Sequence, residues 1–254
     1  MKKTIEKFHV HYREGTADEE VLSHSFDKDI FLASIREVLL PAKPIVLDIG
    51  AHIGTFSLYV SRKRPKSKTY AIEACRDTFR ILEKNIRENH LENRVQFFHL
   101  ALSDADGMAH LSYSQGNWGH SITKKLSEDG EDVTSKSLGN FFKEYEISWC
   151  DLAKFNCEGA EFNIILGAPI DVLSKIGLMI ILYHNDLKSP EFGDESTLIK
   201  HLNDSGFFCR VINKKQYRGW IIAKNKKVYN PKMESVKLAG IKAFRKIKTT
   251  LKWK

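Results

Sequence analysis

The stretch PIVLDIGAHIGTFS, residues 44–57, decides the fold of this chain. Residues 45–49 form a short, β-branched apolar run, which is typical of a parallel strand buried on both faces. Gly50 and Gly54 bracket a tight turn that leads into an expected helix over residues 55–62. In an open α/β sheet, a strand-to-helix crevice of this kind is where a nucleotide-like ligand lies.

Asp48, at the carboxyl end of the strand, indicates the charge of that ligand. Dinucleotide and P-loop sites present helix amides to phosphate groups, but this turn contains neither GxGxxG nor GK[ST]. An acid before the turn would repel a pyrophosphate and would suit a cationic amino-acid group. With backbone contacts expected at Gly50, Ala51 and Gly54, the turn favours S-adenosylmethionine.

A second acid follows at the spacing expected for a nucleoside cofactor. Residues 69–73 predict a short strand that ends in Glu73, 19 residues beyond Gly54. A carboxylate at this place can accept hydrogen bonds from both ribose hydroxyls. The alternatives are a turn cap for Asp48 and a solvated strand end for Glu73. The two acids together, at this spacing, favour the cofactor.

A third block, DLAKFNCEGAE at residues 151–161, carries a family resemblance. It resembles the D-x-x-K-x-D-x-E-G-x-E block of the FkbM-type methyltransferases. Other segments resemble that family as well: DIGAHIG at 48–54, Glu73, ALSD at 101–104, Gly107 and Gly167. The resemblance covers about residues 26–167 and extends more faintly to His184.

The chain departs from the family pattern at three positions. Asn156, His52 and Ala74 stand where the family usually has Asp, Asn and Pro. The change at Asn156 removes a charge near the expected reaction centre. It therefore keeps open the alternative that the protein is a catalytically inactive cofactor-binding scaffold.

The resemblance implies a class I methyltransferase fold, an α/β architecture. We expect a Rossmann-like, seven-stranded, mostly parallel sheet with helices on both faces. Three segments are predicted: an N-terminal helical segment over residues 1–40 that packs on the core, a methyltransferase domain over 41–223, and a basic amphipathic tail over 224–254.

Other local patterns give less specific expectations. Apolar spacing predicts a helix over residues 26–40, with Ser25 as its N-cap. Residues 95–102 predict a single third strand, and the polar residues 124–136 predict a solvated connection with a turn at 129–130.

The resemblance also implies the reaction, which is O-methylation of a hydroxyl. The expected acceptors are a sugar of a surface glycan or of its lipid-linked precursor, or a small natural product. Groups that act on the acceptor should lie on loops at the carboxyl ends of the strands. Candidates there are Asn156 and Glu158 after one strand, His184 after the next, and His120 in the GNWGHS loop.

A histidine can accept a hydroxyl proton near neutral pH. The alternatives are a locally hydrogen-bonded histidine and, for Glu158, an acid favoured by the helix dipole. A divalent ion held by Asn156, Glu158, His184 and Asp186 is a further alternative, which we do not favour because the family's acid is missing at position 156.

The adenine edge is expected at Ala101, Leu102 and Asp104, with Asp104 as acceptor for the adenine amino group. The alternative is that Asp104 stabilises the turn before Gly107. The [ND]PP[YF] motif of enzymes that methylate flat amino groups is absent from the chain, which argues against that chemistry.

The net charge of +8 is concentrated in the tail. Residues 224–254 contain 11 Lys and Arg and one acid, so the rest of the chain contains 29 basic and 31 acidic residues. A nucleic-acid enzyme should carry its basic surface around the site, and the body of this chain is nearly neutral. The second hypothesis is therefore RNA binding or RNA methylation that uses the basic tail. A basic amphipathic helix over 232–254 would lie on an anionic membrane surface, unless it docks on the body or frays.

The remaining composition indicates the compartment. No run approaches 18 apolar residues, and the first residues lack the apolar stretch of a signal peptide. The four cysteines show no metal-binding spacing and are expected to be reduced. We therefore expect a cytoplasmic protein, with peripheral membrane contact through the tail. The identity of the acceptor and the oligomeric state are left open.

Overall fold

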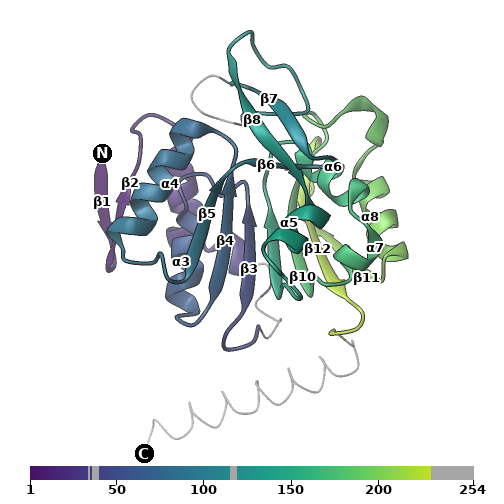
Figure 1. Ribbon diagram of the computed structural model, residues 1–254, viewed down its shortest axis with the longest axis horizontal. Helices are drawn as coiled ribbons and strands as arrows, with labels where there is room; N and C mark the ends of the chain where they lie inside the picture. Colours follow the sequence, from purple (N-terminus) through teal and green to yellow (C-terminus); the bar gives the residue numbers. More distant parts are fainter. Residues whose placement is uncertain (34, 36–39, 115–118, 230–254) are drawn as a thin grey trace, which may run out of the picture.

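The computed structural model describes residues 1–33, 35, 40–114 and 119–229. Its centre is a seven-stranded sheet in the order β11-β12-β10-β9-β3-β4-β5 (Figure 1). The strands are β3 (Ile45–Ile49), β4 (Lys68–Glu73), β5 (Val95–His99), β9 (Leu152–Phe155), β10 (Leu178–His184), β11 (Phe207–Ile212) and β12 (Arg218–Asn225). Only the pairs that involve β12 are antiparallel, which confirms the predicted mostly parallel sheet.

Helices cover both faces of the sheet because alternate strand residues point in opposite directions. On β3, Leu47 and Ile49 belong to one apolar cluster, and Val46 belongs to another. The helices that follow β3 and β4 are α3 (Thr55–Lys63) and α4 (Arg76–Glu88). Later in the chain come α5 (Leu138–Glu144), α6 (Ala160–Gly167), α7 (Ile170–Leu173), the 3₁₀ turn η3 (Pro190–Phe192) and α8 (Glu195–Asp204).

A smaller sheet corrects two of the expectations. The single strand expected over residues 95–102 is divided at Leu100 into β5 and β6 (Ala101–Ser103). Part of the expected solvated connection is β8 (Gly130–Ser137), which pairs with β6 and with β7 (Gly107–Ser112). The polar sequence of β8 did not predict a strand, because β8 is stabilised by pairing with its neighbours. Of its residues, only Val133 belongs to an apolar cluster.

The N-terminal segment also differs from the expected single helix. It begins with a hairpin of β1 (Lys2–Ile5) and β2 (Phe8–His11), followed by α1 (Ala17–Leu22), the π-helical η1 (Ser23–Asp27) and α2 (Ile30–Ala33). Thr16 caps α1 by accepting from the amide of Asp18. Ser25 is not a cap, because its hydroxyl donates to Thr55. Positions 34 and 36–39 of the expected helix lie outside the described residues.

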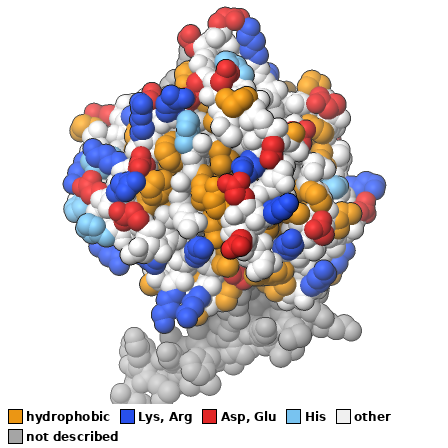
Figure 2. Space-filling model, viewed as in Figure 1, with side chains coloured by type: hydrophobic (Ala, Val, Ile, Leu, Met, Phe, Trp, Pro, Cys, Tyr) orange, Lys and Arg blue, Asp and Glu red, His pale blue; other side chains and the backbone are white. Residues whose placement is uncertain are grey.

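Charge is mixed on the face of the molecule that Figure 2 shows. Lys and Arg side chains alternate with Asp and Glu side chains over the described elements, and apolar side chains lie between them. This pattern agrees with the nearly balanced charge of the chain before the tail. The tail from residue 230 onward lies outside the described residues, so its predicted helix stays a prediction.

Candidate active site

A cavity opens at the carboxyl ends of β3, β4, β9 and β10. Residues from those strand ends line it, together with α1, η1 and the loop around residue 120. Eight predicted site residues lie on its wall: Gly50, Glu73, Ala101, Leu102, His120, Asn156, Glu158 and His184. Four others do not line it: Asp48, Ala51, Gly54 and Asp104. The fold therefore brings eight of the predicted cofactor and acceptor residues together on one wall.

The glycine turn after β3 is packed too tightly for a side chain at Gly50. The amides of Gly50 and Ala51 both donate to the carbonyl of Ile72, at 3.0 and 2.9 Å. Gly50 has a φ of +70°, and a Cβ there would lie 1.9 Å from the carbonyl oxygen of Asn156. Glycine is therefore required both for its backbone conformation and for the close approach of β9.

Replacing Gly50 with Ala should destabilise the protein by more than backbone strain alone. Gly15 has a similar φ of +68°, but a Cβ added there would have no atom within 4 Å, so Gly15→Ala is the matched control. We expect the control to cost about 1 kcal/mol and Gly50→Ala to cost about 1–3 kcal/mol more. Urea unfolding of both variants measures the difference, and equal midpoints would contradict the packing described here.

Asp48, just before this turn in the chain, lies in the buried interior and does not line the cavity. The side chain is fully buried, and its two oxygens contact Lys154 Nζ at 3.0 Å and the Ser57 hydroxyl at 2.7 Å. Lys154 faces Asp48 across the β3–β9 pair and also donates to the Gly50 carbonyl at 2.6 Å. The ion pair between Asp48 and Lys154 therefore holds the turn. The contact between Asp48 and the cofactor stays a prediction.

Glu73, at the end of β4, holds the same loop from the cavity side. Its two carboxylate oxygens accept from the amides of His52 and Cys75, at 2.8 and 2.9 Å. Burial raises the pKa of Glu73, although these amides oppose the shift. A carboxylate has about four acceptor sites, so two remain for ribose hydroxyls. The residue can therefore take the predicted role.

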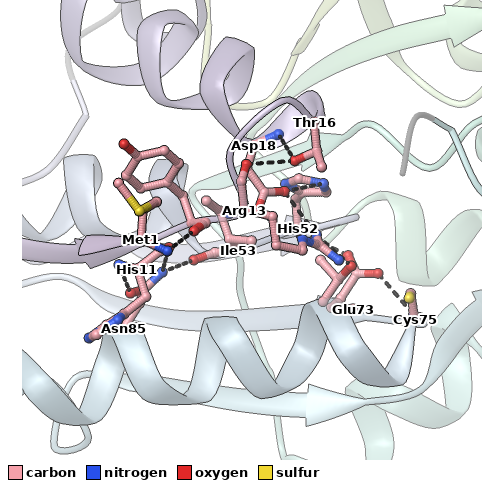
Figure 3. A network of polar contacts seen from close by, with 12 residues as sticks. Met1, His11, Arg13, Thr16, Asp18, His52, Ile53, Glu73, Cys75 and Asn85 are labelled. Carbon is pink, nitrogen blue, oxygen red and sulfur yellow. Dashed lines mark hydrogen bonds and ion pairs between the residues drawn. The ribbon is translucent and has the colours of Figure 1, made fainter. Parts of the chain in front are cut away.

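The N-terminal segment closes another side of the cavity through a network of polar contacts (Figure 3). Arg13 donates twice to the buried Asp18, at 2.9 and 2.8 Å, and also to Thr78. The Nε2 atom of His52 lies 3.5 Å from Asp18. Burial lowers the pKa of His52 to about 4, so its ring is neutral at pH 7.

This network holds α1 and η1 against the cavity, and the sequence patterns did not predict that residues of these helices would line the site. The cavity wall includes Ala17, Glu20, Val21 and His24. Their only signal in the sequence is the helical spacing of positions 17, 20, 21 and 24, and nothing local indicates that this face covers a cavity. The N-terminal segment is thus part of the site as well as a support for the core.

On the acceptor side, the turn after β9 directs Glu158 toward the end of β10. Glu158 and Gly159 both have left-handed backbones, with φ of +51° and +101°. The Oε2 atom of Glu158 lies 3.4 Å from Nε2 of His184. A Cβ on Gly119 would lie 2.8 Å from the same carboxylate oxygen, so the loop that contains His120 packs directly on Glu158. Strained non-glycine residues of this kind often occur at functional sites.

His184 is buried between two carboxylates. Its Nδ1 lies 3.0 Å from Glu161, and only 1% of the residue is exposed. Apart from their contact with each other, His184 Nε2 and Glu158 Oε2 have no hydrogen-bond partner among the described residues. Burial opposes protonation of the ring, but Glu158 and Glu161 outweigh it and raise the pKa of His184.

The other predicted site residues, three on the acceptor side and Asp104 at the expected adenine edge, are arranged differently. His120 Nδ1 accepts from the amide of Ser114 at 3.0 Å, and burial lowers the pKa of this histidine. The side-chain oxygen of Asn156 is buried and has no partner in the described part of the chain. Asp186 is 3.3 Å from Arg218 and does not line the cavity. Asp104 accepts from the neighbouring Ser103 hydroxyl, which fits its alternative role in the turn.

Comparison with known proteins assigns a family to this arrangement. The family model described as "Methyltransferase FkbM domain" matches residues 48–218, which is more than half of the chain. The chain belongs to the FkbM methyltransferase family. This membership agrees with the class I methyltransferase fold of the described residues.

Individual relatives agree with this assignment. "Methyltransferase sdnD" of Sordaria araneosa is 28% identical over 55% of this chain and 66% of its own length. "Methyltransferase 1" of Beauveria bassiana is 29% identical over 55% of this chain and 65% of its own length. The chain therefore spans just under two thirds of each relative. A solved FkbM methyltransferase from Methylobacillus flagellatus shares the fold, with a TM-score of 0.53, 11% identity, and coverage of 80% of this chain and 47% of the other.

Two properties of the described residues bear on the remaining expectations. None of the helices in that part of the chain is long and apolar enough to cross a membrane. Within the same residues, no group of three or more His, Cys, Asp or Glu side chains is arranged to hold a metal ion. We assign no metal ligands.

Proposed function

We propose that this protein methylates a hydroxyl group and that His184 takes the hydroxyl proton. The observation that carries the proposal is the buried ring of His184, a residue of the cavity wall. Its Nε2 atom has no hydrogen-bond donor or acceptor among the described residues other than the neighbouring Glu158. An unpaired buried nitrogen is costly, and an acceptor hydroxyl would pair with it.

The residues of the cavity fit an S-adenosyl cofactor. Glu73 has free acceptor sites for the ribose, Gly50 lies on the wall at the turn, and Ala101 and Leu102 provide an apolar edge for adenine. When bound, the cofactor supplies an electrophilic methyl group. Asp48 is paired with Lys154 and does not line the cavity, so its contact with the cofactor's amino group stays a prediction.

The acceptor-side residues supply proton removal and positioning. A hydroxyl within reach of His184 Nε2 can transfer its proton to the ring as its oxygen attacks the methyl group. The Glu158 carboxylate, 3.4 Å from Nε2, then stabilises the imidazolium. The unpartnered oxygen of Asn156 can accept from a second acceptor hydroxyl or from the cofactor. This division of roles does not need the charge that the family has at position 156.

The acceptor that we propose is a neutral sugar or a similar polyhydroxylated molecule, either in a surface glycan, in a lipid-linked precursor or in a small natural product. The wall offers several polar side chains to such a molecule, including Glu20, His24 and Arg218. Glu20 and His24 precede the matched family range of 48–218. These two residues, which also contact each other at 3.1 Å, are our candidates for acceptor contacts outside that range.

The test is methyl transfer from isotopically labelled S-adenosylmethionine to matched acceptors. The full-length protein is incubated with neutral methyl glycosides, with the corresponding amino sugars and with tRNA, and the products are analysed by mass spectrometry. We expect label in methyl ethers and none in RNA. Label in amines alone would contradict hydroxyl transfer. A parallel reaction with a chelator, with and without added magnesium, decides the metal alternative.

The second hypothesis, RNA binding through the tail, receives no support from the described residues. The charge before the tail is nearly balanced, and the face in Figure 2 shows interspersed charges. Peripheral contact of residues 232–254 with an anionic membrane remains our proposal for the tail, which lies outside the described residues.

A further inference from the structure

We propose that Glu161 is a positioning residue that fixes the tautomer and the orientation of His184, so that Nε2 is the nitrogen that carries the lone pair. The inference rests on the proposed function, because it assigns the residue that prepares the base. In the sequence, Glu161 belongs to a family motif and nothing there indicates its role.

The contacts of Glu161 all lead to the acceptor side of the site. The side chain is fully buried in the first turn of α6. One carboxylate oxygen, Oε1, accepts from the backbone amide of His184 at 2.7 Å and lies 3.0 Å from its Nδ1. The other oxygen accepts from the amide of Gly159 at 3.1 Å and contacts the Cys157 thiol at 3.5 Å. One carboxylate thus joins the end of β10 to the turn that carries Glu158.

These contacts determine which nitrogen of His184 carries the proton. Both oxygens of Glu161 accept from backbone amides, which favours the ionised carboxylate, and an ionised carboxylate can only accept. Nδ1 must therefore donate to it. A neutral imidazole has one N–H group, so Nε2 must hold the lone pair. The same pair of contacts, to the amide and to the ring of one residue, also prevents the ring from turning away.

The proton and electron balance follows from this tautomer. The acceptor O–H bond breaks and an N–H bond forms at Nε2. The acceptor oxygen forms the new C–O bond while the C–S bond of the bound cofactor breaks, and that electron pair remains on sulfur. The imidazolium lies between Glu158 and Glu161 and afterwards releases its proton to water.

Three charged groups face His184 from the elements around it. They are Glu161 on α6, Glu158 in the turn before α6, and Arg218 on β12. The two carboxylates favour the imidazolium, and Arg218 opposes it. Removing the charge of Glu161 should therefore lower the pKa of His184, and the rise of activity with pH should move to lower pH.

The test compares Glu161→Gln with Glu195→Gln in the full-length protein. Glu195 is also a buried acid, with partners Asn185 and Lys214, but it does not line the cavity. We expect Glu161→Gln to lower kcat about 10²–10⁴-fold, the range seen when the carboxylate behind a catalytic histidine is neutralised. Affinity for S-adenosylhomocysteine and KM should change less than about twofold, and Glu195→Gln should retain activity.

Two readouts separate positioning from a purely structural role. The pH profile of kcat in Glu161→Gln should move to lower pH, whereas a loss of folded protein would lower the profile without moving it. An unmoved profile with an unchanged kcat would overturn the proposal.

The ¹⁵N NMR shifts of the wild-type histidine ring do not depend on any variant's folding. We expect His184 protonated at Nδ1 above its pKa, and protonation at Nε2 would overturn the proposal. Should the wild type fail to methylate any hydroxyl, the proposed function would fail, and this spectrum would still decide the role of Glu161.

Discussion

Replacing His184 with Gln is expected to lower kcat about 10²–10⁴-fold, because a missing general base typically has that effect. Glu73 and Gly50, which we propose as cofactor contacts, are elsewhere on the wall, so affinity for S-adenosylhomocysteine should change less than about twofold. The rate is measured with the labelled cofactor and the best hydroxyl acceptor, and affinity is measured by calorimetry.

His120→Gln is the matched comparison, because His120 also lines the cavity but its Nδ1 is occupied by the amide of Ser114. We expect it to retain kcat within about tenfold. The wild-type kcat should rise with pH, since the base must be neutral, and the rise should lie above pH 6.5 because the pKa of His184 is raised. A wild-type kcat in His184→Gln would remove this residue from the reaction.

Lys154→Met should lower the free energy of unfolding by about 3–5 kcal/mol, the cost of removing one partner of a buried ion pair. Both partners are buried, and among the described residues the variant would leave the Asp48 carboxylate with the Ser57 hydroxyl as its one remaining partner. The Gly50 carbonyl would lose its contact as well. Urea unfolding of the full-length protein measures the effect.

The control is Lys200→Met, which removes an ion pair with Asp204 whose side chains are 80% and 63% exposed. Exposed pairs contribute about 0–1 kcal/mol, so the control should remain close to the wild type. If Lys154→Met behaves like the control, the ion pair does not hold the glycine turn.

The sequence predicted the central strands and the glycine turn because each depends on local patterns. The apolar run of β3 and the acid that ends β4 both appear where the structure has them. The positive φ of Gly50 and Gly54 confirms the expected turn. The same patterns failed for β8, whose strand forms through pairing with β6 and β7 rather than through its own apolar residues.

The roles of the charged residues could not be predicted in the same way, because they depend on contacts between distant positions. Asp48 and Lys154 are 106 residues apart in the sequence and meet only through the pairing of β3 with β9. Glu161 and His184 are 23 residues apart and meet only when α6 packs beside β10. The position of α1 at the cavity likewise involves long-range contacts, between Arg13 and Thr78, 65 residues apart, and between Asp18 and His52.

The most direct test of the account is calorimetric titration of the full-length protein with S-adenosylhomocysteine. We predict one binding site per chain, with no comparable signal from NAD or ATP. Glu73→Gln should weaken this binding about 10–150-fold, which corresponds to the roughly 1.5–3 kcal/mol of a hydrogen bond to a charged group. Absence of binding by the wild type, or equal affinity in Glu73→Gln, would contradict the placement of the cofactor at the carboxyl ends of β3 and β4.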